Sequence, residues 1–113
     1  MSYMDTLRDR AKMLREWRVW ATRVAVAVKE NLPGAQVYVI GSVVRGDHTG
    51  GSDIDILILS DALPNKSIER AQLKVKIEEA AKLPLSHPFQ FHLATPPEAE
   101  AYFRMSGKSA LKL

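Results

Sequence analysis

The sequence predicts an α/β (α+β) protein, in which helices and short strands alternate within a single domain over residues 1–113. Three short segments are rich in β-branched and aromatic residues, as strands are, and segments with helical spacing of apolar residues lie between them. A chain of 113 residues can bury one core but is short for two. Its 46% apolar and 26% charged residues are ordinary for a globular protein and argue against disorder.

The first expected element is a helix over residues 5–30. Apolar residues recur there at steps of three and four and so share one stripe, formed by Leu7, Leu14, Trp17, Ala21, Val24 and Val28. Pro33-Gly34 ends the segment. About 25 residues is long for a small domain, so either one kinked helix or two helices fits the pattern. We expect Trp17 and Trp20 to lie in the core, the alternative being a partner surface.

Three strands are expected, at Gln36–Ile40, Ile54–Leu59 and Phe89–Ala94. The second is apolar almost throughout, which is typical of a strand in the middle of a sheet. The third alternates apolar and polar residues. Residues 43–52, between the first two strands, are rich in glycine and predict a turn-rich connection.

A second long helix is expected over residues 67–82, with a broad apolar side formed by Ile68, Ala71, Leu73, Val75, Ile77 and Ala80. Its basic residues Lys74, Lys76 and Lys82 are interpreted as solvated, with nucleic-acid binding as the alternative. Thr95 and Glu98 have the spacing of a capping box and start a further helix that runs to about Met105. Residues 108–113 are expected to be a short tail, either helical or frayed.

Several classes of protein are excluded by composition. The absence of cysteine excludes disulfides, zinc thiolate sites, iron–sulfur clusters and cysteine nucleophiles. No apolar run approaches the roughly 18 residues of a membrane span, and the N-terminus has no signal-peptide pattern. We therefore expect a cytoplasmic protein without a membrane partner. The net charge is +3, with an acidic segment over residues 36–65 between basic flanks, which suits a cation site in basic surroundings.

The segment with the clearest chemistry lies between the first two strands. Gly41-Ser42 directly follows the first strand, where glycine lets backbone approach a phosphate and serine adds a hydroxyl. Asp53 and Asp55 are two residues apart on a predicted strand, so their carboxylates are expected on one face. Such oxygen ligands suit Mg²⁺, and Arg45 adds a planar cation. Together these are the parts that phosphoryl or nucleotidyl transfer requires.

Gly41-Ser42, ten intervening residues and Asp53-Ile54-Asp55 resemble the signature of the DNA polymerase beta-type nucleotidyltransferase superfamily. The fuller pattern resembles its small stand-alone branch, the minimal nucleotidyltransferases. The resemblance implies the nucleotidyltransferase fold, a small mixed β-sheet packed against helices. It implies that Asp53 and Asp55 bind Mg²⁺, that Gly41 and Ser42 hold nucleotide phosphates, and that Arg45 and Ser52 support the site.

The same resemblance implies a partner protein. Many minimal nucleotidyltransferases pair with a small helical HEPN-type protein, and some act as antitoxins by adenylylating a tyrosine of that toxin. The leading hypothesis is therefore a Mg²⁺-dependent nucleotidyltransferase that transfers AMP from ATP to a hydroxyl of such a protein or of RNA. Nucleic-acid binding through the basic flanks is less favoured, because aromatic and basic residues do not alternate. The sequence leaves a homo-oligomer open.

One position departs from the superfamily pattern, which has a third carboxylate on the strand after the second long helix. Here that strand contains Gln90, whose amide oxygen can bind a metal but cannot act as a general base. His92 is expected on the same face and can take a proton, the alternative being a polar residue on a partly exposed strand. A catalytically degenerate module that acts by binding its HEPN-type partner is therefore the second hypothesis.

Overall fold

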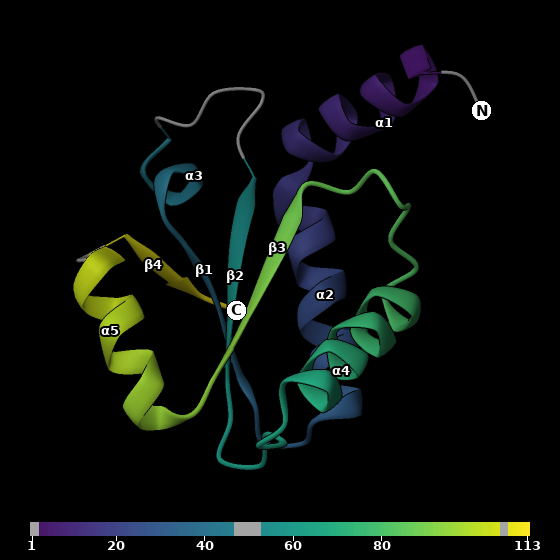
Figure 1. The fold of residues 1–113 in the computed structure, drawn as a ribbon. Coiled ribbons are helices and arrows are strands. Elements are labelled where there is room, and N and C mark those ends of the chain that lie inside the picture. The colour runs from purple at the N-terminus through teal and green to yellow at the C-terminus, as the bar shows by residue number, and fades with distance from the viewer. Residues whose placement is uncertain (1–2, 47–52, 107–108) are drawn as a thin grey trace.

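The computed structural model describes residues 3–46, 53–106 and 109–113 (Figure 1). Within these residues the elements are α1 (Tyr3–Arg15), α2 (Trp17–Asn31), β1 (Gln36–Ile40), α3 (Ser42–Arg45), β2 (Ile54–Leu59), α4 (Ser67–Ala80), β3 (Phe89–Ala94), α5 (Pro96–Ser106) and β4 (Ala110–Lys112). The four strands form one sheet in the order β3-β2-β1-β4. β2 and β3 are parallel, and the other two pairings are antiparallel, so the expected mixed sheet is confirmed.

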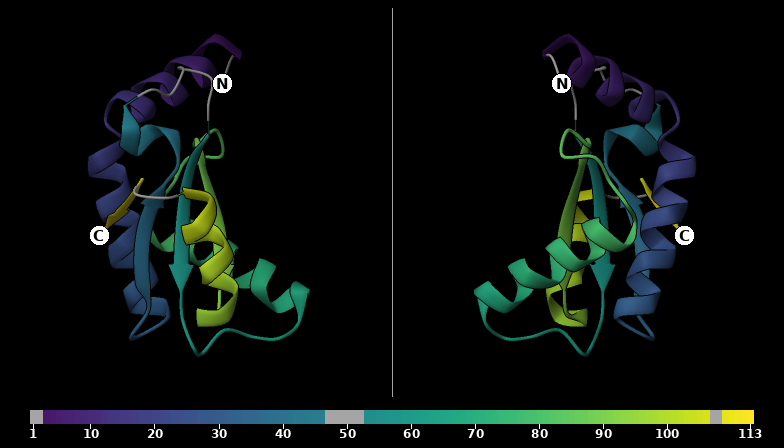
Figure 2. Two further views of the ribbon diagram at one scale, coloured as in Figure 1. Left: turned by 90° about the vertical axis from the view of Figure 1, so that its left-hand side faces the viewer. Right: turned by 90° about the vertical axis from the view of Figure 1, so that its right-hand side faces the viewer.

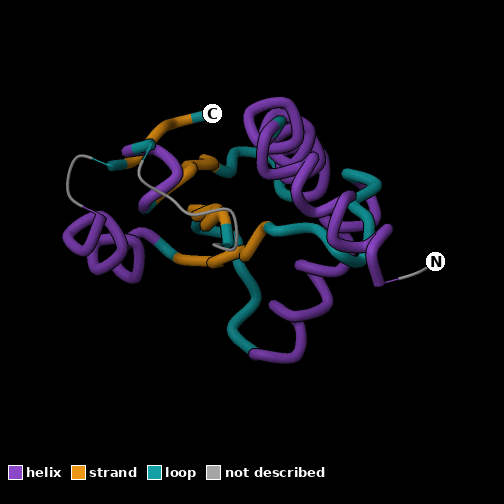
Figure 3. The backbone as a smooth tube through the Cα atoms, turned by 90° about the horizontal axis from the view of Figure 1, so that it is seen from above, coloured by secondary structure: helices purple, strands orange, loops and turns teal. Residues whose placement is uncertain are grey.

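Helices cover both faces of this sheet (Figures 1 and 3). The chain moves outward from β2 through α4 to β3, and then back across the sheet through α5 to β4. Because crossovers between parallel strands are right-handed, connections that run in opposite directions place their helices on opposite faces. α2 and α4 therefore share one face, over Ile54, Ile56 and Ile58, and α5 covers the other, over Leu57.

The strand predictions are confirmed at their expected bounds. Ile54, Ile56, Leu57 and Ile58 of β2 are fully buried, because this strand is covered on both faces. This agrees with the central position that the apolar run predicted. The capping box at the start of α5 is also confirmed, since the backbone N–H of Thr95 donates to Glu98 Oε1 at 3.0 Å.

The N-terminal segment forms two helices rather than one, with the break at Glu16. Five of the six predicted stripe residues are buried against the sheet, and these are Leu14, Trp17, Ala21, Val24 and Val28. Trp20 is half-buried beside them. Leu7 was predicted on the same stripe but is exposed. The reason is that α1 extends beyond the end of the sheet, where no strand lies beneath it (Figure 2).

Two other expectations are wrong. The C-terminal tail is not helical, because Ala110–Lys112 pairs with the free edge of β1 and Leu111 packs against the core. α4 ends at Ala80, and its apolar residues do not form one side. Leu73 and Ile77 pack inward, whereas Ile68 and Val75, seven residues apart, point outward and are 64% and 50% exposed. Among the described residues, no helix is both long and apolar enough to cross a membrane.

Candidate active site

The glycine after β1 and the aspartate on β2 lie together at one end of the sheet. Ile40 pairs with Asp55 across the antiparallel β1–β2 ladder, so the loop that begins at Gly41 starts beside that carboxylate. A Cβ atom on Gly41 would lie 3.5 Å from Asp55 Oδ2. Gly41 has φ +88° and ψ −155°, a region that only glycine adopts without strain. The turn therefore requires glycine at this position.

Asp55 also contacts His92. Both side chains lie on the α5 face of the parallel β2–β3 pair, and His92 Nε2 is 2.9 Å from Asp55 Oδ1. A carboxylate can only accept, so Nε2 carries the proton, and in the neutral ring Nδ1 keeps the lone pair. The Tyr102 ring lies 5.3 Å from the imidazole, centre to centre. Asp55 thus fixes the orientation of the imidazole and the ring nitrogen that carries the proton.

Gln90 pairs with Asp55 in the β2–β3 register and is exposed. Because Gln90 is the register partner of Asp55 on the neighbouring strand, the two side chains lie on the same face of the sheet. The resemblance to the superfamily predicts its third acid on this strand, and the alignment of that acid with Gln90 stays a prediction.

Asp53 lies just before β2, so the expectation that both aspartates are strand residues is wrong for this one. Its carboxylate accepts a hydrogen bond from Arg10 Nη2 at 2.8 Å and is 57% exposed. Arg10 Nη1 also donates to the carbonyl of His87 at 3.4 Å. Asp53 is therefore bound by Arg10 of α1 and Asp55 by His92 of β3. Neither contact could be predicted from the spacing of residues in the sequence.

A cavity of about 340 Å³ opens beside these groups, between β1, α3 and α5. It is lined by Ile40, Gly41, Arg45, Asp55, His92, Tyr102 and Met105. Four of these residues, Gly41, Arg45, Asp55 and His92, were predicted from the sequence to belong to the site. Ser42 is half-buried at the start of α3, and Ser52 lies outside the described residues. Tyr102 and Met105 were missed, because only the return of the chain from β3 to β4 brings α5 over this end of the sheet.

The donor set has the composition that Mg²⁺ prefers. Two carboxylates, Asp53 and Asp55, and the amide oxygen of Gln90 are all hard oxygen ligands, and Mg²⁺ commonly takes one or two carboxylates with water and substrate phosphates. Among the described residues, no group of three or more histidine, cysteine or acidic side chains could hold a metal ion. A Mg²⁺ ion here would therefore depend on substrate oxygens to complete its shell.

A clamp between α4 and α5 holds the far side of β3. Arg70 donates from Nη1 and Nη2 to Glu98 at 3.3 and 3.2 Å, from Nε to the Pro64 carbonyl at 2.7 Å and from Nη1 to the Leu93 carbonyl at 3.5 Å. The hydrogen bonds from Arg70, together with those from Thr95, lower the pKa of Glu98 to about 2. Glu98 therefore stays ionised under all ordinary conditions.

His87, in the loop that leads into β3, has a structural role. His87 Nδ1 accepts from the Phe89 N–H at 3.1 Å, and Nε2 lies 2.6 Å from Glu78 Oε2. The ring stacks with Phe89 and Phe91. These contacts fix the loop that leads into β3.

The chain matches one family of known proteins and is similar to solved structures. Residues 22–112 match the family model of the nucleotidyltransferase domain. No curated protein matches the chain. Among solved structures, the chain is similar to a candidate nucleotidyltransferase from Sulfolobus solfataricus, with TM-score 0.61 and 19% identity over 95% of this chain and 84% of that chain. It is also similar to a toxin-antitoxin structure with AMP-PNP, with TM-score 0.55 and 22% identity over 81% of this chain and 70% of that chain. What these two structures share with the chain is the fold.

Proposed function

Because the chain belongs to the nucleotidyltransferase domain family, we propose that it is a Mg²⁺-dependent enzyme that transfers AMP from ATP to a hydroxyl of a protein or an RNA. The observation that carries this proposal is the convergence of Gly41, Asp55 and His92 on one cavity. Gly41 and Ser42 would hold the phosphates, with Arg45 and Ser52 supporting them. Asp53, Asp55 and Gln90 would bind Mg²⁺, which supplies neutralisation of the phosphate charge.

In the proposed reaction, the acceptor oxygen bonds to the α-phosphorus of ATP while the bond to the bridging oxygen of pyrophosphate breaks. The acceptor proton needs a base. Gln90 cannot serve as one, since an amide has no basic nitrogen. His92 can, because its contact with Asp55 keeps the proton on Nε2 and leaves Nδ1 with a lone pair. We therefore assign the proton to His92.

The proposed acceptor is a HEPN-type partner protein. Two points support it: the fold is shared with a toxin-antitoxin structure with AMP-PNP, and the glycine and aspartate motifs resemble those of the minimal nucleotidyltransferases. In this role the chain would act as an antitoxin by modifying its partner.

A specific observation favours a second candidate, a degenerate module that acts by binding its partner. The strand position next to Asp55 holds an amide in place of a carboxylate, and Asp53 is paired with Arg10. The two candidates differ in the effect of Gln90→Glu. A degenerate site gains transfer activity with the restored carboxylate, whereas a site that uses His92 as its base is already active with glutamine.

The first test is isothermal titration calorimetry of ATP with and without Mg²⁺. For the wild type we expect binding that depends on Mg²⁺, and for Asp53→Asn or Asp55→Asn a loss of at least about tenfold in affinity, about 1.4 kcal/mol. Asp61→Asn is the matched control, because Asp61 is exposed in the turn at the opposite end of β2. Equal affinity in the Asp55 and Asp61 variants would refute the assignment of Asp55.

The assignment of His92 is tested by transfer of labelled AMP to the partner. General base catalysis contributes about 10²–10⁴-fold, so His92→Gln should slow transfer by at least about 100-fold while ATP still binds. Transfer at the wild-type rate would exclude His92 as the base.

A further inference from the structure

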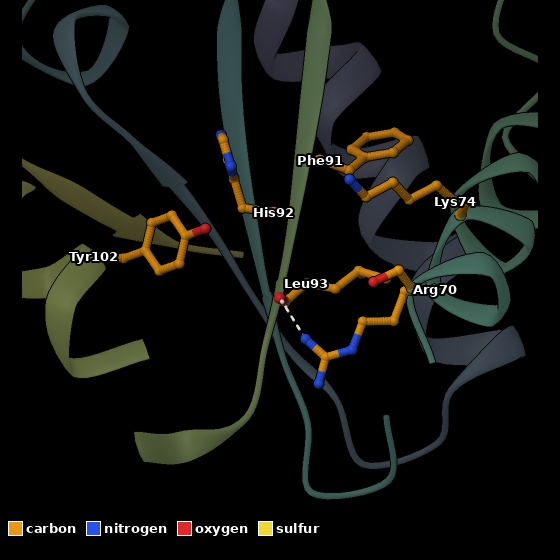
Figure 4. Close-up of a pocket in the computed structure, with 8 residues that line it drawn as sticks. Arg70, Lys74, Phe91, His92, Leu93 and Tyr102 are labelled. Atoms are coloured by element: carbon orange, nitrogen blue, oxygen red, sulfur yellow. Dashed lines mark hydrogen bonds between the residues drawn. The ribbon is translucent and has the colours of Figure 1, made fainter. Parts of the chain in front are cut away.

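A second cavity, of about 260 Å³, lies at the outer edge of β3 between α4 and α5 (Figure 4). It is lined by Ser67, Arg70, Ala71, Lys74, Phe91, His92, Leu93 and Tyr102. His92 and Tyr102 also line the first cavity. These two side chains therefore separate a space toward β1, which holds the proposed ATP site, from a space toward α4. A group bound in this second space, here called the α4 cleft, reaches His92 from the side away from Gly41.

The two cations of the α4 cleft are in different states. The Arg70 guanidinium is engaged by Glu98 and by the carbonyls of Pro64 and Leu93. Lys74 is half-buried and, among the residues that the structure describes, has no hydrogen-bond or ion-pair partner. Figure 4 shows Lys74 reaching from α4 toward Phe91, with Tyr102 pointing toward β3 from the other side. An ammonium on a half-buried side chain, without a partner among the described residues, favours a bound carboxylate or phosphate.

The rim of the α4 cleft is apolar. Ile68, Ala71 and Val75 lie on one face of α4, at steps of three and four residues, and all three are exposed. Ala71 belongs both to this face and to the cleft, so the two surfaces are continuous. Exposed apolar helix faces of this kind are typical of protein interfaces. Nucleic-acid sites instead use several lysines and arginines to neutralise successive phosphates. In the described cleft, Arg70 is already paired with Glu98, which leaves the charge of Lys74 for a bound group.

We propose that the α4 cleft and its apolar rim form a docking surface for an acidic segment of a partner protein. Lys74 pairs with a carboxylate of that segment, and Ile68 and Val75 cover its apolar side chains. The segment would then present its hydroxyl to His92, and this last step rests on the proposed transferase function. The docking itself does not depend on transfer.

The test uses fluorescence anisotropy with fluorescein-labelled copolymers as probes: one of glutamate and tyrosine, and one of lysine and tyrosine. The variants are Lys74→Glu and the matched control Lys76→Glu, which changes the net charge equally. Lys76 is exposed and lies on the other flank of α4, since it is two residues from Lys74 and a helix turns 100° per residue. We expect Lys74→Glu to weaken binding of the acidic copolymer about tenfold and Lys76→Glu less than about twofold.

A second variant tests the rim independently of charge. Ile68→Ser removes an exposed apolar side chain that the fold does not bury, so the protein should remain folded, and it should weaken the acidic copolymer about threefold. Equal losses in Lys74→Glu and Lys76→Glu would show binding to net charge alone and overturn the proposal. It would also be overturned if a single-stranded RNA oligonucleotide bound the wild type more tightly than the acidic copolymer and lost that binding in Lys74→Glu.

Calorimetry with ATP and Mg²⁺ on the wild type separates this proposal from the proposed function. If the wild type does not bind ATP, the nucleotide site is refuted. The docking surface is still supported in that case if Lys74→Glu weakens binding of the acidic copolymer more than Lys76→Glu does. Binding of ATP together with no discrimination between the two variants refutes the docking surface and leaves the nucleotide site standing.

Discussion

Replacing Gly41 with alanine tests the turn on which the candidate active site is built. Gly41 has φ +88° and ψ −155°. Its backbone is held on both sides, because its N–H donates to the Ser109 carbonyl at 3.1 Å and its own carbonyl accepts from the Val44 N–H at 3.2 Å. The chain therefore cannot relax the angle without losing one of these hydrogen bonds. An alanine must adopt the strained conformation or displace the turn.

The size of the effect follows from the same geometry. A residue other than glycine in this region costs about 1–3 kcal/mol. The added Cβ would lie 3.5 Å from Asp55 Oδ2, which is an ordinary contact, so crowding adds little to the strain. We therefore expect Gly41→Ala to lose about 1–3 kcal/mol of unfolding free energy and to weaken binding of ATP, because the turn beside Asp55 shifts.

Urea unfolding and ATP calorimetry measure the two effects. Gly46→Asn is the control: Gly46 has φ +78° and ψ +11°, a left-handed conformation that asparagine tolerates, and a Cβ there would have no neighbour within 4 Å among the described atoms. It should cost less than about 1 kcal/mol. If Gly41→Ala unfolds at the wild-type urea concentration and binds ATP with the wild-type affinity, the argument from strain is refuted.

Three further predictions concern packing and charge. Leu57→Ala, at a fully buried position under α5, should lose about 2–5 kcal/mol in urea unfolding, and a loss below about 1 kcal/mol would contradict the described core. The pKa of Glu98 falls from 4.5 to about 2 on folding, so the stability difference between wild type and Glu98→Gln should be constant above about pH 5 and vanish as the pH falls to 2. A stability difference that does not depend on pH would exclude the Arg70 clamp. Arg10→Ala should change stability by less than about 1 kcal/mol, because Asp53 is mostly exposed, but it should tighten Mg²⁺ binding. Arg8→Ala, at an exposed neighbouring position on α1, is the control. Equal Mg²⁺ affinities in the two variants would exclude competition between Arg10 and Mg²⁺ for Asp53.

The elements that were predictable from sequence are those whose signal is local. β2 could be placed because six residues with almost no polar interruption need cover on both faces, and α5 because Thr95 and Glu98 satisfy each other at its start. β4 could not, because three residues carry no period and Leu111 gains its strand conformation from the free edge of β1. The outward turn of Ile68 and Val75 depends on which side of α4 meets the sheet, and the pattern of α4 itself offers apolar residues on both sides.

The site divides in the same way. Gly41 and Asp55 could be proposed together because each residue type has its own chemistry, and the β1–β2 pairing then brings them side by side. The partners of the two aspartates could not be foreseen. Arg10 is 43 residues from Asp53 in the chain and His92 is 37 residues from Asp55, and both contacts arise only from the packing of α1 and β3. Tyr102 comes from α5, whose sequence is that of an ordinary amphipathic helix.

These partners also bear on whether the fold needs a cation to balance its carboxylates. A cluster of carboxylates without compensating groups is destabilised by mutual repulsion until a cation binds. Here Asp53 is paired with Arg10, Asp55 is hydrogen-bonded to His92, and the two side chains are 57% and 36% exposed. Gln90 adds no charge at the position next to Asp55. The repulsion is therefore already relieved by the protein itself.

We accordingly expect that, without nucleotide, a chelator such as EDTA shifts the melting temperature of the wild type by less than about 2 °C relative to Mg²⁺ buffer. Arg10→Ala is the informative variant. It leaves Asp53 without its cation, so its melting temperature should rise on addition of Mg²⁺ by more than that of the wild type. A fall of more than about 5 °C when wild type is transferred to EDTA would show that metal, and not Arg10 and His92, balances the carboxylates.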